Sequence, residues 1–258
     1  MACPTAVKRK THMLASTANP SQTPALPTPQ KNRRPATKPL RSRLSPAARE
    51  REIVEGAIAY FSDVGFSGQT RELSRRLGVT QPLLYRYFPS KQALIERVFK
   101  EVFLGRWDAA WLTGIEDRNR PLHDRLLDFY QAYAAATYRP EWIRIYMYAG
   151  LSDTGFNRRY IGLIQRQLLA AICRELRKHC RVASKKPVTR AEIEFVWKLH
   201  GGMFYYAIRR FIYRAPVEQD FAASADHAIT AFLAGARKVY PELLRTPKKS
   251  PAKRPAAP

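Results

Sequence analysis

The sequence predicts an all-α fold with two helical parts, residues 45–106 and 107–244. Apolar side chains recur at intervals of three and four residues through most of this span, which is the spacing that places them on one face of a helix. No segment shows the alternating apolar and polar pattern of a strand over any length. A chain of 258 residues with 45% hydrophobic content is also long enough to bury a substantial core.

The two ends of the chain have a different composition. Residues 1–44 contain nine Lys or Arg, seven Pro and no Asp or Glu, and residues 245–258 contain five more cations and four Pro. Such segments cannot bury enough apolar surface to fold, so we expect two disordered basic tails. The net charge of +24, much of it in these tails, indicates a polyanionic partner. The tails either solubilise the protein or add sequence-independent contacts to DNA.

The first and fourth helices of the N-terminal part have clear start signals. Ser45 followed by Pro46 predicts the beginning of the first helix, because serine is a good N-cap and proline fits the first helical position. Gly65 is expected to end it, and its apolar stripe consists of Ile53, Ala57, Ile58 and Phe61. Ser90 is expected to cap the fourth helix. Its apolar side is predicted to carry Ala93, Leu94, Val98, Val102 and Leu104.

Between these helices, residues 70–89 contain two short helical patterns separated by a three-residue turn, the arrangement of a helix-turn-helix. Each pattern offers an apolar pair four residues apart to a shared core. The pairs are Leu73 with Leu77 and Leu84 with Phe88. Gly78 can adopt the positive φ that ends the first of these helices, and Thr80 is a suitable N-cap for the second.

The second of these helices has an outer surface that suits DNA. The residues on its outer face and front end are Gln81, Pro82, Leu83, Tyr85, Arg86 and Tyr87. An α-helix fits the major groove of B-DNA, a glutamine can pair with an adenine edge, and apolar side chains can contact a thymine methyl. The tyrosines and Lys91 at the rim can bind phosphates. The alternative is an ordinary helical hairpin with a solvated surface, since motif matches also arise by chance.

The pattern extends beyond the bare motif. From Ile53 to Leu94 the chain contains Ile-Val-Glu-Gly-Ala-Ile-Ala-Tyr-Phe, then Gly-Phe, Thr-Arg-Glu-Leu, Leu-Gly-Val, Leu-Tyr, Tyr-Phe and Ser-Lys. These residues resemble the DNA-binding domain of the TetR family of transcriptional regulators. The resemblance implies that residues 45–106 form a DNA-binding domain and that residues 107–244 form a helical domain for effector binding and dimerisation.

The resemblance also implies a role for individual positions. Thr70 would bind a phosphate at a helix N-terminus, while Arg71 and Gln81 would each contact a base. The expected DNA-binding residues are Thr70, Arg71, Thr80, Gln81, Pro82, Leu83, Tyr85, Arg86, Tyr87 and Lys91. Within this set Pro82 and Leu83 would make apolar contacts, and Tyr85, Tyr87 and Lys91 would bind the DNA backbone. Leu83 and Arg86 differ from the residues usual at their positions, which affects the operator sequence but not the mode of docking.

The second part contains further helical segments at residues 121–138, 140–150, 156–180, 190–213 and 218–240, with a polar, basic loop at 181–187. Aromatic residues in its middle helices could line a ligand cavity. The candidates are Tyr130, Tyr133, Trp142 and Tyr146, with His200 from a later helix. The alternative is that they are core residues. Arg144 and Arg166 are the cations that could meet an acidic ligand.

The last two helices carry wide apolar stripes. Such a stripe either closes the core of one chain or pairs with a second chain. In TetR-like proteins the corresponding helices form a four-helix dimer interface, and Gly201 and Gly202 would allow a close approach there. By this resemblance the expected interface residues are Trp197, Phe204, Ile229 and Phe232.

No motif in the sequence indicates an enzyme, a metal site or a cofactor. The three cysteines lack CxxC spacing, the histidines are scattered, and no GxSxG, Walker or GxGxxG motif is present. No segment is expected to be a signal peptide or to cross a membrane. Together with the resemblance, this predicts a cytoplasmic, homodimeric transcriptional regulator. It would be a repressor that binds a near-palindromic double-stranded DNA operator and is released by a small-molecule effector. The alternatives are a DNA-coating protein driven by the tails, a helical regulator without a ligand, or a helical enzyme that keeps the family's N-terminal domain.

Overall fold

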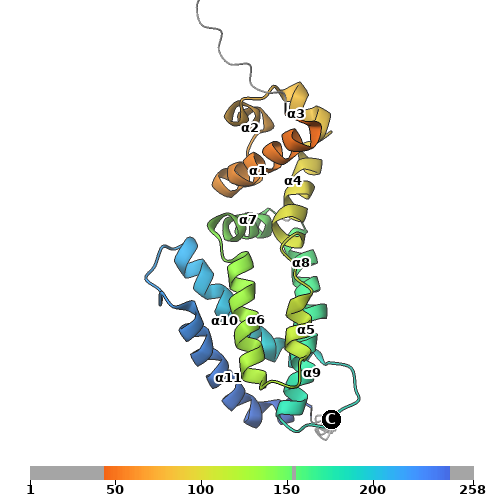
Figure 1. The fold of residues 1–258 in the computed structure, drawn as a ribbon, viewed down its shortest axis with the longest axis vertical. Coiled ribbons are helices and arrows are strands. Elements are labelled where there is room, and N and C mark those ends of the chain that lie inside the picture. The colour runs from red at the N-terminus through yellow and green to blue at the C-terminus, as the bar shows by residue number, and fades with distance from the viewer. Residues whose placement is uncertain (1–43, 153–154, 245–258) are drawn as a thin grey trace, which may run out of the picture. The chain divides into compact units, whose positions relative to one another are not determined.

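The computed structural model describes residues 44–152 and 155–244, and these residues form helices and no strand (Figure 1). The predicted all-α fold is confirmed. The N-terminal helices are α1 (Pro46–Val64), α2 (Thr70–Leu77), α3 (Gln81–Tyr87) and α4 (Lys91–Phe99), which continues as the π-helical segment η1 (Lys100–Leu104). Next come α5 (Ala110–Glu116), α6 (Leu122–Thr137), α7 (Pro140–Leu151) and α8 (Phe156–Ile164). The last elements are η2 (Gln165–Leu169), α9 (Ala170–His179), α10 (Arg190–Phe211) and α11 (Phe221–Leu243). The two predicted tails lie outside the described residues, except for Leu44.

The predicted start and end of α1 and the predicted start of α4 are confirmed by their hydrogen bonds. The Ser45 hydroxyl accepts a hydrogen bond from the backbone N–H of Ala48 at 3.2 Å, and Pro46 is the first helical residue. Gly65 ends the helix with a φ of 76°. At the start of α4, the Ser90 hydroxyl accepts from the N–H of Ala93 at 3.0 Å. These contacts satisfy backbone donors that would otherwise be unpaired at a helix start.

The end of the fourth helix differs from the prediction. Val102 and Phe103 are buried in η1, whereas Leu104, expected on the same apolar side, is 43% exposed. Val102 and Leu104 are two residues apart, so at 3.6 residues per turn they lie on opposite sides of the helix. The predicted apolar side was therefore too wide at this end, and Leu104 belongs to the exposed side.

The structure also differs from the prediction at α5 and at the start of α11. No helix was predicted between residues 107 and 120, but α5 lies there, with Trp111 and Ile115 buried against α6 and α9. It has a single apolar pair, which is too little for a periodicity to be recognised. The final helix begins at Phe221 and not at Glu218, because the Asp220 carboxylate accepts hydrogen bonds from the N–H groups of Ala222 and Ala223.

A buried ion pair joins α9 and α10, and a hydrogen bond from α11 completes it, in addition to the apolar packing among these helices. The guanidinium of Arg177 on α9 donates two hydrogen bonds of 2.7 Å to Glu192 on α10, and the hydroxyl of Tyr240 on α11 donates to the same carboxylate. Burial by itself would raise the pKa of Glu192, but the bonds from Arg177, Thr189 and Tyr240 lower it to about 2. The carboxylate thus stays charged and connects three helices. In the described ranges, no helix combines the length and apolar character needed to cross a membrane.

Candidate nucleic-acid interface and cavity

The turn between α2 and α3 has the geometry that the sequence predicted. Gly78 lies in the left-handed region at φ 63° and ψ 30°, and its N–H donates to the carbonyls of Ser74 and Arg75. The Thr80 hydroxyl accepts from the N–H of Leu83 at 3.3 Å and so caps α3. Leu73 of α2 and Leu84 of α3 are both buried. The turn therefore forms a helix-turn-helix with α3 as its second helix.

The predicted DNA-binding residues lie on the surface of these two helices to different extents. Pro82, Tyr85 and Arg86 are exposed. Arg71 and Thr80 are exposed as well, and the half-buried members of the set are Thr70, Gln81, Leu83, Tyr87 and Lys91. The ring of Tyr87 packs against the core, so less of it is available to DNA than the pattern suggested. The hydroxyls of Thr70 and Tyr85 are hydrogen-bonded at 2.9 Å, which joins the start of α2 to α3.

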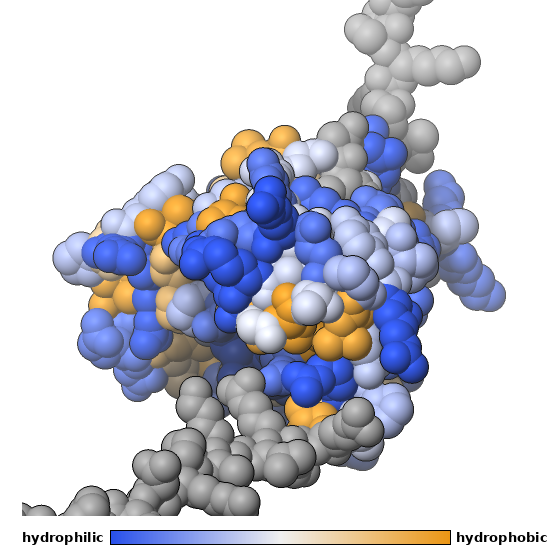
Figure 2. Space-filling model, turned by 90° about the horizontal axis from the view of Figure 1, so that it is seen from above, coloured by the Kyte–Doolittle hydropathy of each residue, from blue (hydrophilic) through white to orange (hydrophobic). Residues whose placement is uncertain are grey.

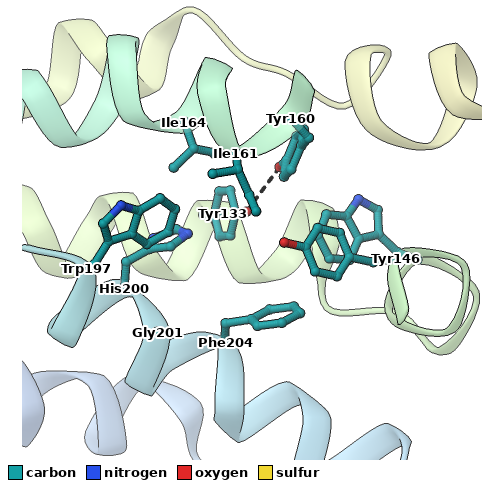
Figure 3. A pocket seen from close by; sticks show the side chains of 10 residues that line it. Tyr133, Tyr146, Tyr160, Ile161, Ile164, Trp197, His200, Gly201 and Phe204 are labelled. Atoms are coloured by element: carbon teal, nitrogen blue, oxygen red, sulfur yellow. Dashed lines mark hydrogen bonds between the residues drawn. The ribbon is translucent and has the colours of Figure 1, made fainter. Parts of the chain in front are cut away.

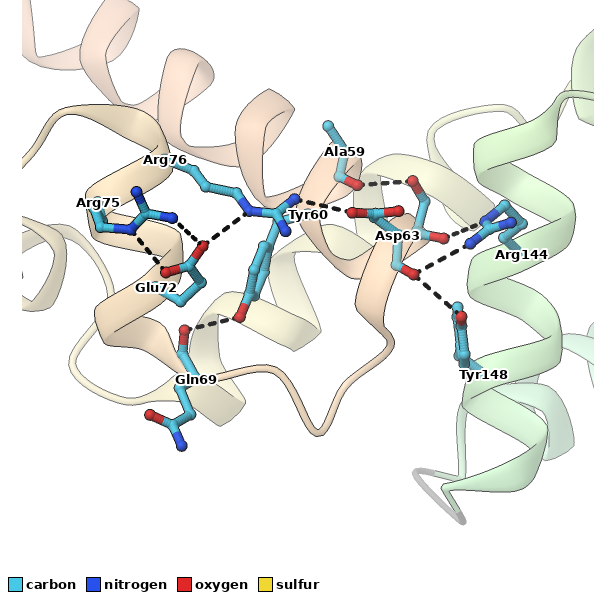
Figure 4. Close-up of polar contacts among 10 residues, drawn as sticks. Ala59, Tyr60, Asp63, Gln69, Glu72, Arg75, Arg76, Arg144 and Tyr148 are labelled. Carbon is cyan, nitrogen blue, oxygen red and sulfur yellow. Dashed lines mark hydrogen bonds and ion pairs between the residues drawn. The ribbon is translucent and has the colours of Figure 1, made fainter.

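The arginines of α2 differ in whether a nearby carboxylate neutralises them. Glu72 binds Arg75 at 2.7 Å and Arg76 at 3.3 Å, and Arg76 also binds Asp63 at 3.0 Å (Figure 4). The hydrogen bond from Arg75, followed by that from Arg76, lowers the pKa of Glu72 to about 2. Within the described ranges, by contrast, Arg71, Arg86 and Lys91 have no ion-pair partner. These three cations are accordingly available to an external anion.

The surface around α2 and α3 is strongly hydrophilic. Figure 2 views the molecule from above, the side on which these helices lie in Figure 1, and shows a mostly hydrophilic face with smaller hydrophobic areas between the polar side chains. Such a face, with unpaired cations beside an exposed helix, is suited to the grooves and phosphates of a nucleic acid.

Comparison with known proteins agrees with this geometry. Residues 53–98, which run from α1 into α4, match the family described as bacterial regulatory proteins of the tetR family. This match identifies a TetR-family domain in residues 53–98. This family consists of transcriptional regulators, so the domain implies DNA-binding regulation of transcription. TetR-family regulators typically act as dimers and respond to small-molecule effectors. No curated protein matches the sequence.

Solved structures extend the similarity in fold beyond the TetR-family domain. A protein from Mesorhizobium loti MAFF303099, described as a TetR-family transcriptional regulator, is 16% identical, with a TM-score of 0.53 over 74% of this chain and 98% of its own. A TetR-family regulator from Pseudomonas syringae pv. tomato str. DC3000 is 18% identical, with a TM-score of 0.51 over 72% and 95%. One from Streptomyces coelicolor is 16% identical, with a TM-score of 0.52 over 77% and 86%. At these identities the likeness shows a shared fold.

Helix α7 lies against the end of α1 and was not recognised as important from the sequence. The guanidinium of Arg144 donates to the backbone carbonyls of Ser62 and Asp63, the latter at 3.1 Å, and the Tyr148 hydroxyl donates to the Asp63 carbonyl at 3.2 Å (Figure 4). A Cβ on Gly65 would lie 2.8 Å from the Tyr148 ring. Glycine at the end of α1 thus allows this contact, while Arg144 points to α1 and not to a ligand.

A cavity of about 60 Å³ lies among α6, α7, α8 and α10 (Figure 3). Four of the five predicted pocket residues line it, namely Tyr133, Trp142, Tyr146 and His200. Tyr130 does not line it; its side chain is fully buried beside His200, with the two ring centres 6.0 Å apart. The remaining lining residues are Tyr160, Ile161, Ile164, Trp197, Gly201 and Phe204.

The predicted interface residues separate into three groups. Trp197 and Phe204 are half-buried in the cavity wall, so part of their apolar surface serves this chain. Ile229 has no exposed surface and packs in the core, which corrects its assignment to a dimer interface. Phe232 is half-buried against Phe195, with ring centres 4.8 Å apart, and remains a candidate. Helical periodicity identified an apolar stripe on each of the two helices but could not tell which positions the neighbouring helices cover.

Proposed function

We propose that the protein is a cytoplasmic, homodimeric repressor that places α3 in the major groove of a near-palindromic operator. A small molecule in the cavity would release it from DNA. The domain boundaries that we propose remain 45–106 for DNA binding and 107–244 for effector binding and dimerisation. One observation carries the DNA-binding part. The starts of α2 and α4 and the exposed face of α3 hold three cations, Arg71, Lys91 and Arg86, without an ion-pair partner among the described residues, next to a half-buried Gln81.

The chemistry of each side chain on this face determines whether we assign it a base contact or a phosphate contact. Gln81 at the first position of α3 can pair with a base edge, and Arg71 at the start of α2 can reach another. The linked hydroxyls of Thr70 and Tyr85 can together donate to a phosphate, since the proton not used between them remains available. Arg86 and Lys91 supply charge without base selection.

Selection of bound sequences from a random DNA pool tests this proposal directly. We expect one enriched near-palindrome whose half-sites lie about one helical turn apart or a small multiple of it. Gln81→Ala should relax the base preference at one position in each half-site, whereas Gln131→Ala, which removes an exposed glutamine on α6, should not. Displacement by random DNA as readily as by the selected site would instead support the DNA-coating alternative.

The salt dependence of binding separates phosphate contacts from base contacts. Lys91→Ala should weaken binding to all sequences equally and lower the slope of log affinity against log salt by about one per chain. Lys185→Ala, in the exposed loop before α10, is the matched control and should leave the slope unchanged. A change in base preference with Lys91→Ala would contradict the phosphate role.

Helix α7 is the proposed link between cavity and DNA. Trp142 and Tyr146, four residues apart, line the cavity, while Arg144 and Tyr148, also four apart, bind the end of α1. A second route runs through packed aromatic rings, since Phe103 contacts both Trp142, with ring centres 5.0 Å apart, and Phe99, at 5.1 Å. A ligand that favours one position of α7 would thereby bias the position of α1.

Arg144→Met tests this link, because methionine retains an apolar side chain but removes every donor. We expect both ligand binding and DNA binding to persist while the effect of one on the other falls, from the 5- to 150-fold that is typical of such coupling towards none. Arg139→Met, at an exposed position just before α7, should retain the coupling. Full coupling in Arg144→Met would exclude this route.

Dimerisation is proposed to use the outer faces of α10 and α11. Tyr205 and Tyr213 are 51% and 61% exposed, and Val239 is 39% exposed. Phe232→Asp should give a helical monomer in sedimentation that has lost operator binding, because an unpaired charge opposes burial between chains. Ile229→Asp, one helical turn earlier but in the core, should unfold the chain. A helical dimer of unchanged mass in Phe232→Asp would argue against this interface.

A further inference from the structure

The wall of the cavity contains many aromatic rings and no charged side chain. Its lining includes tyrosine, tryptophan and phenylalanine rings, and Arg144 and Arg166, the cations considered for an acidic ligand, are not part of it. His200 is the lining residue that could become charged near neutral pH, but burial lowers its pKa to about 4. Burial likewise raises the pKa of Tyr133 and Tyr160. At neutral pH the wall is therefore uncharged.

An uncharged wall selects against charged ligands. A carboxylate or an ammonium group that leaves water must find an opposite charge, or its transfer costs far more than apolar contact returns. Aromatic faces attract cations, yet no carboxylate completes this cavity. Aromatic rings of a ligand, by contrast, can make stacked and edge-to-face contacts with the wall, in which the rings of Trp142 and Tyr146 already stack at 5.2 Å with an interplanar angle of 7°.

Two buried polar atoms on lining residues have no hydrogen-bond partner among the residues that the structure describes. They are Nε1 of Trp142, a residue that is 2% exposed, and Nδ1 of His200, a residue that is 5% exposed. An unpaired buried polar atom is costly, so a ligand that supplies its partner gains affinity. The tryptophan N–H can only donate, whereas a neutral histidine offers one donor and one acceptor. A hydroxyl group can satisfy either atom.

The cavity has an open side between α8 and α10. Ile161 on α8 is 37% exposed and Gly201 on α10 is exposed, and both belong to the lining (Figure 3). A Cβ placed on Gly201 would meet no atom within 4 Å. The volume of about 60 Å³ is below the roughly 150 Å³ that encloses a benzene ring, so a single ring would occupy the cavity and extend into this opening.

We propose that the cavity binds a small uncharged molecule of about one aromatic ring that carries a hydroxyl group and enters past Gly201. The ring lies among Trp142, Tyr146 and Phe204, and the hydroxyl pairs with His200 or with the indole N–H of Trp142. This assignment rests on the proposed function of the cavity as an effector site, and it names the class of ligand that the site accepts.

A matched series of single-ring probes tests the class. Benzyl alcohol, toluene, benzoate and benzylammonium are of similar size and differ in polarity and charge. Binding to the full chain without DNA is measured by ligand-observed NMR, with competition by benzyl alcohol. We expect benzyl alcohol to bind at least tenfold more tightly than either charged probe and several-fold more tightly than toluene. Tighter binding of a charged probe, or saturable binding of none, would overturn the proposal.

Two neighbouring glycines provide the control for location. Gly201→Leu places a side chain in the opening and should weaken benzyl alcohol binding at least tenfold. Gly202→Leu makes the same change at an exposed position on α10 that is not part of the lining and also has open space around it, so binding should persist. Both changes remove a glycine from within a helix, which favours folding. Circular dichroism checks that each variant keeps its helices, and sedimentation shows whether either leucine changes the dimer, since both glycines are exposed on α10. Equal binding by both variants would place the ligand elsewhere.

The hydroxyl contact is tested by His200→Phe and Trp142→Phe, which keep a ring at each position. One of them should reduce benzyl alcohol affinity to that of toluene, and retention of the preference in both would exclude the contact. The result is independent of DNA. If benzyl alcohol binds but does not release an operator, the ligand class stands and effector release fails. If no probe binds while operator selection succeeds, the ligand class fails and the DNA-binding proposal stands.

Discussion

The exposed and half-buried residues of segment 70–91, which we call the α2–α3 surface, and the aromatic cavity are constructed in opposite ways. The α2–α3 surface comes from one continuous segment, exposes its polar residues, and leaves Arg71, Arg86 and Lys91 without ion-pair partners among the described residues. The cavity collects residues from α6, α7, α8 and α10, most of them buried or half-buried, and its lining contains no charged side chain. The first is suited to a polyanion and the second to an uncharged molecule.

This contrast indicates in which region a substitution changes both the stability of the chain and its binding. Residues of the α2–α3 surface contribute few buried contacts, so substitutions there should alter binding with little effect on folding. Most residues of the cavity wall belong to the core or pack against it, so substitutions at these positions change the stability of the chain as well as the site. Four predictions test this difference.

The largest expected effect is on stability. Trp142→Ala should lower the free energy of unfolding by about 3 to 5 kcal/mol, because it removes a buried ring and enlarges the cavity. Gln81→Ala should change it by less than about 0.5 kcal/mol. Urea unfolding followed by circular dichroism measures both values. Similar losses in the two variants would show that α3 is more tightly coupled to the core than its exposure suggests.

Acid should destabilise the cavity before it affects the α2–α3 surface. The native pKa of His200 is about 4, below the ordinary value of 6.5, so the unfolded chain binds a proton that the native chain does not. The free energy of unfolding should therefore fall as pH decreases from 6.5 towards 4, by up to about 3 kcal/mol.

Glu72 on α2 has a native pKa of about 2, below its ordinary value of 4.5, so its contribution is lost only below pH 4.5. His200→Phe should remove most of the slope between pH 6.5 and 4.5 in urea unfolding. Burial also lowers the pKa of His179, which accounts for a residual slope. An unchanged slope in the variant would contradict a buried neutral His200.

Two arginines on the same helix should differ in their effect on DNA binding. Arg71→Ala should cost about 1 to 3 kcal/mol on the selected operator, because Arg71 is exposed and has no ion-pair partner among the described residues. Arg75→Ala should cost much less, since Glu72 already neutralises Arg75. Fluorescence anisotropy with the selected duplex measures both. A larger loss from Arg75→Ala would show that the Glu72 pair opens on DNA.

The smallest effect distinguishes two glycines. Gly78→Ala should destabilise the chain by about 1 to 2 kcal/mol, because residue 78 has a φ of 63° and an alanine there is strained even with open space around it. Gly202→Ala, within α10, should stabilise it by about 1 kcal/mol through helix propensity. Thermal unfolding of both variants gives the signs. A stabilising Gly78→Ala would mean that the turn can adopt another conformation.

The sequence by itself determined the local features of the TetR-family domain. Ser45, Thr80 and Ser90 were identified as N-caps and Gly78 as a left-handed C-cap, and the structure confirms each. These features rest on hydrogen bonds between residues three or four apart, so a short stretch of sequence contains the whole interaction. The roles of Arg71, Gln81 and Lys91 on DNA remain predictions.

Only the tertiary structure decided what the C-terminal helices do with their apolar faces. Periodicity placed Trp197, Phe204 and Ile229 on stripes, but packing put the first two in the cavity wall and the third in the core. In the same way, Arg144 binds the carbonyls at the end of α1, more than 80 positions earlier in the chain. The helical repeat specifies which side of a helix is apolar. Which neighbour covers that side depends on contacts between distant segments, and these form only when the whole chain has packed.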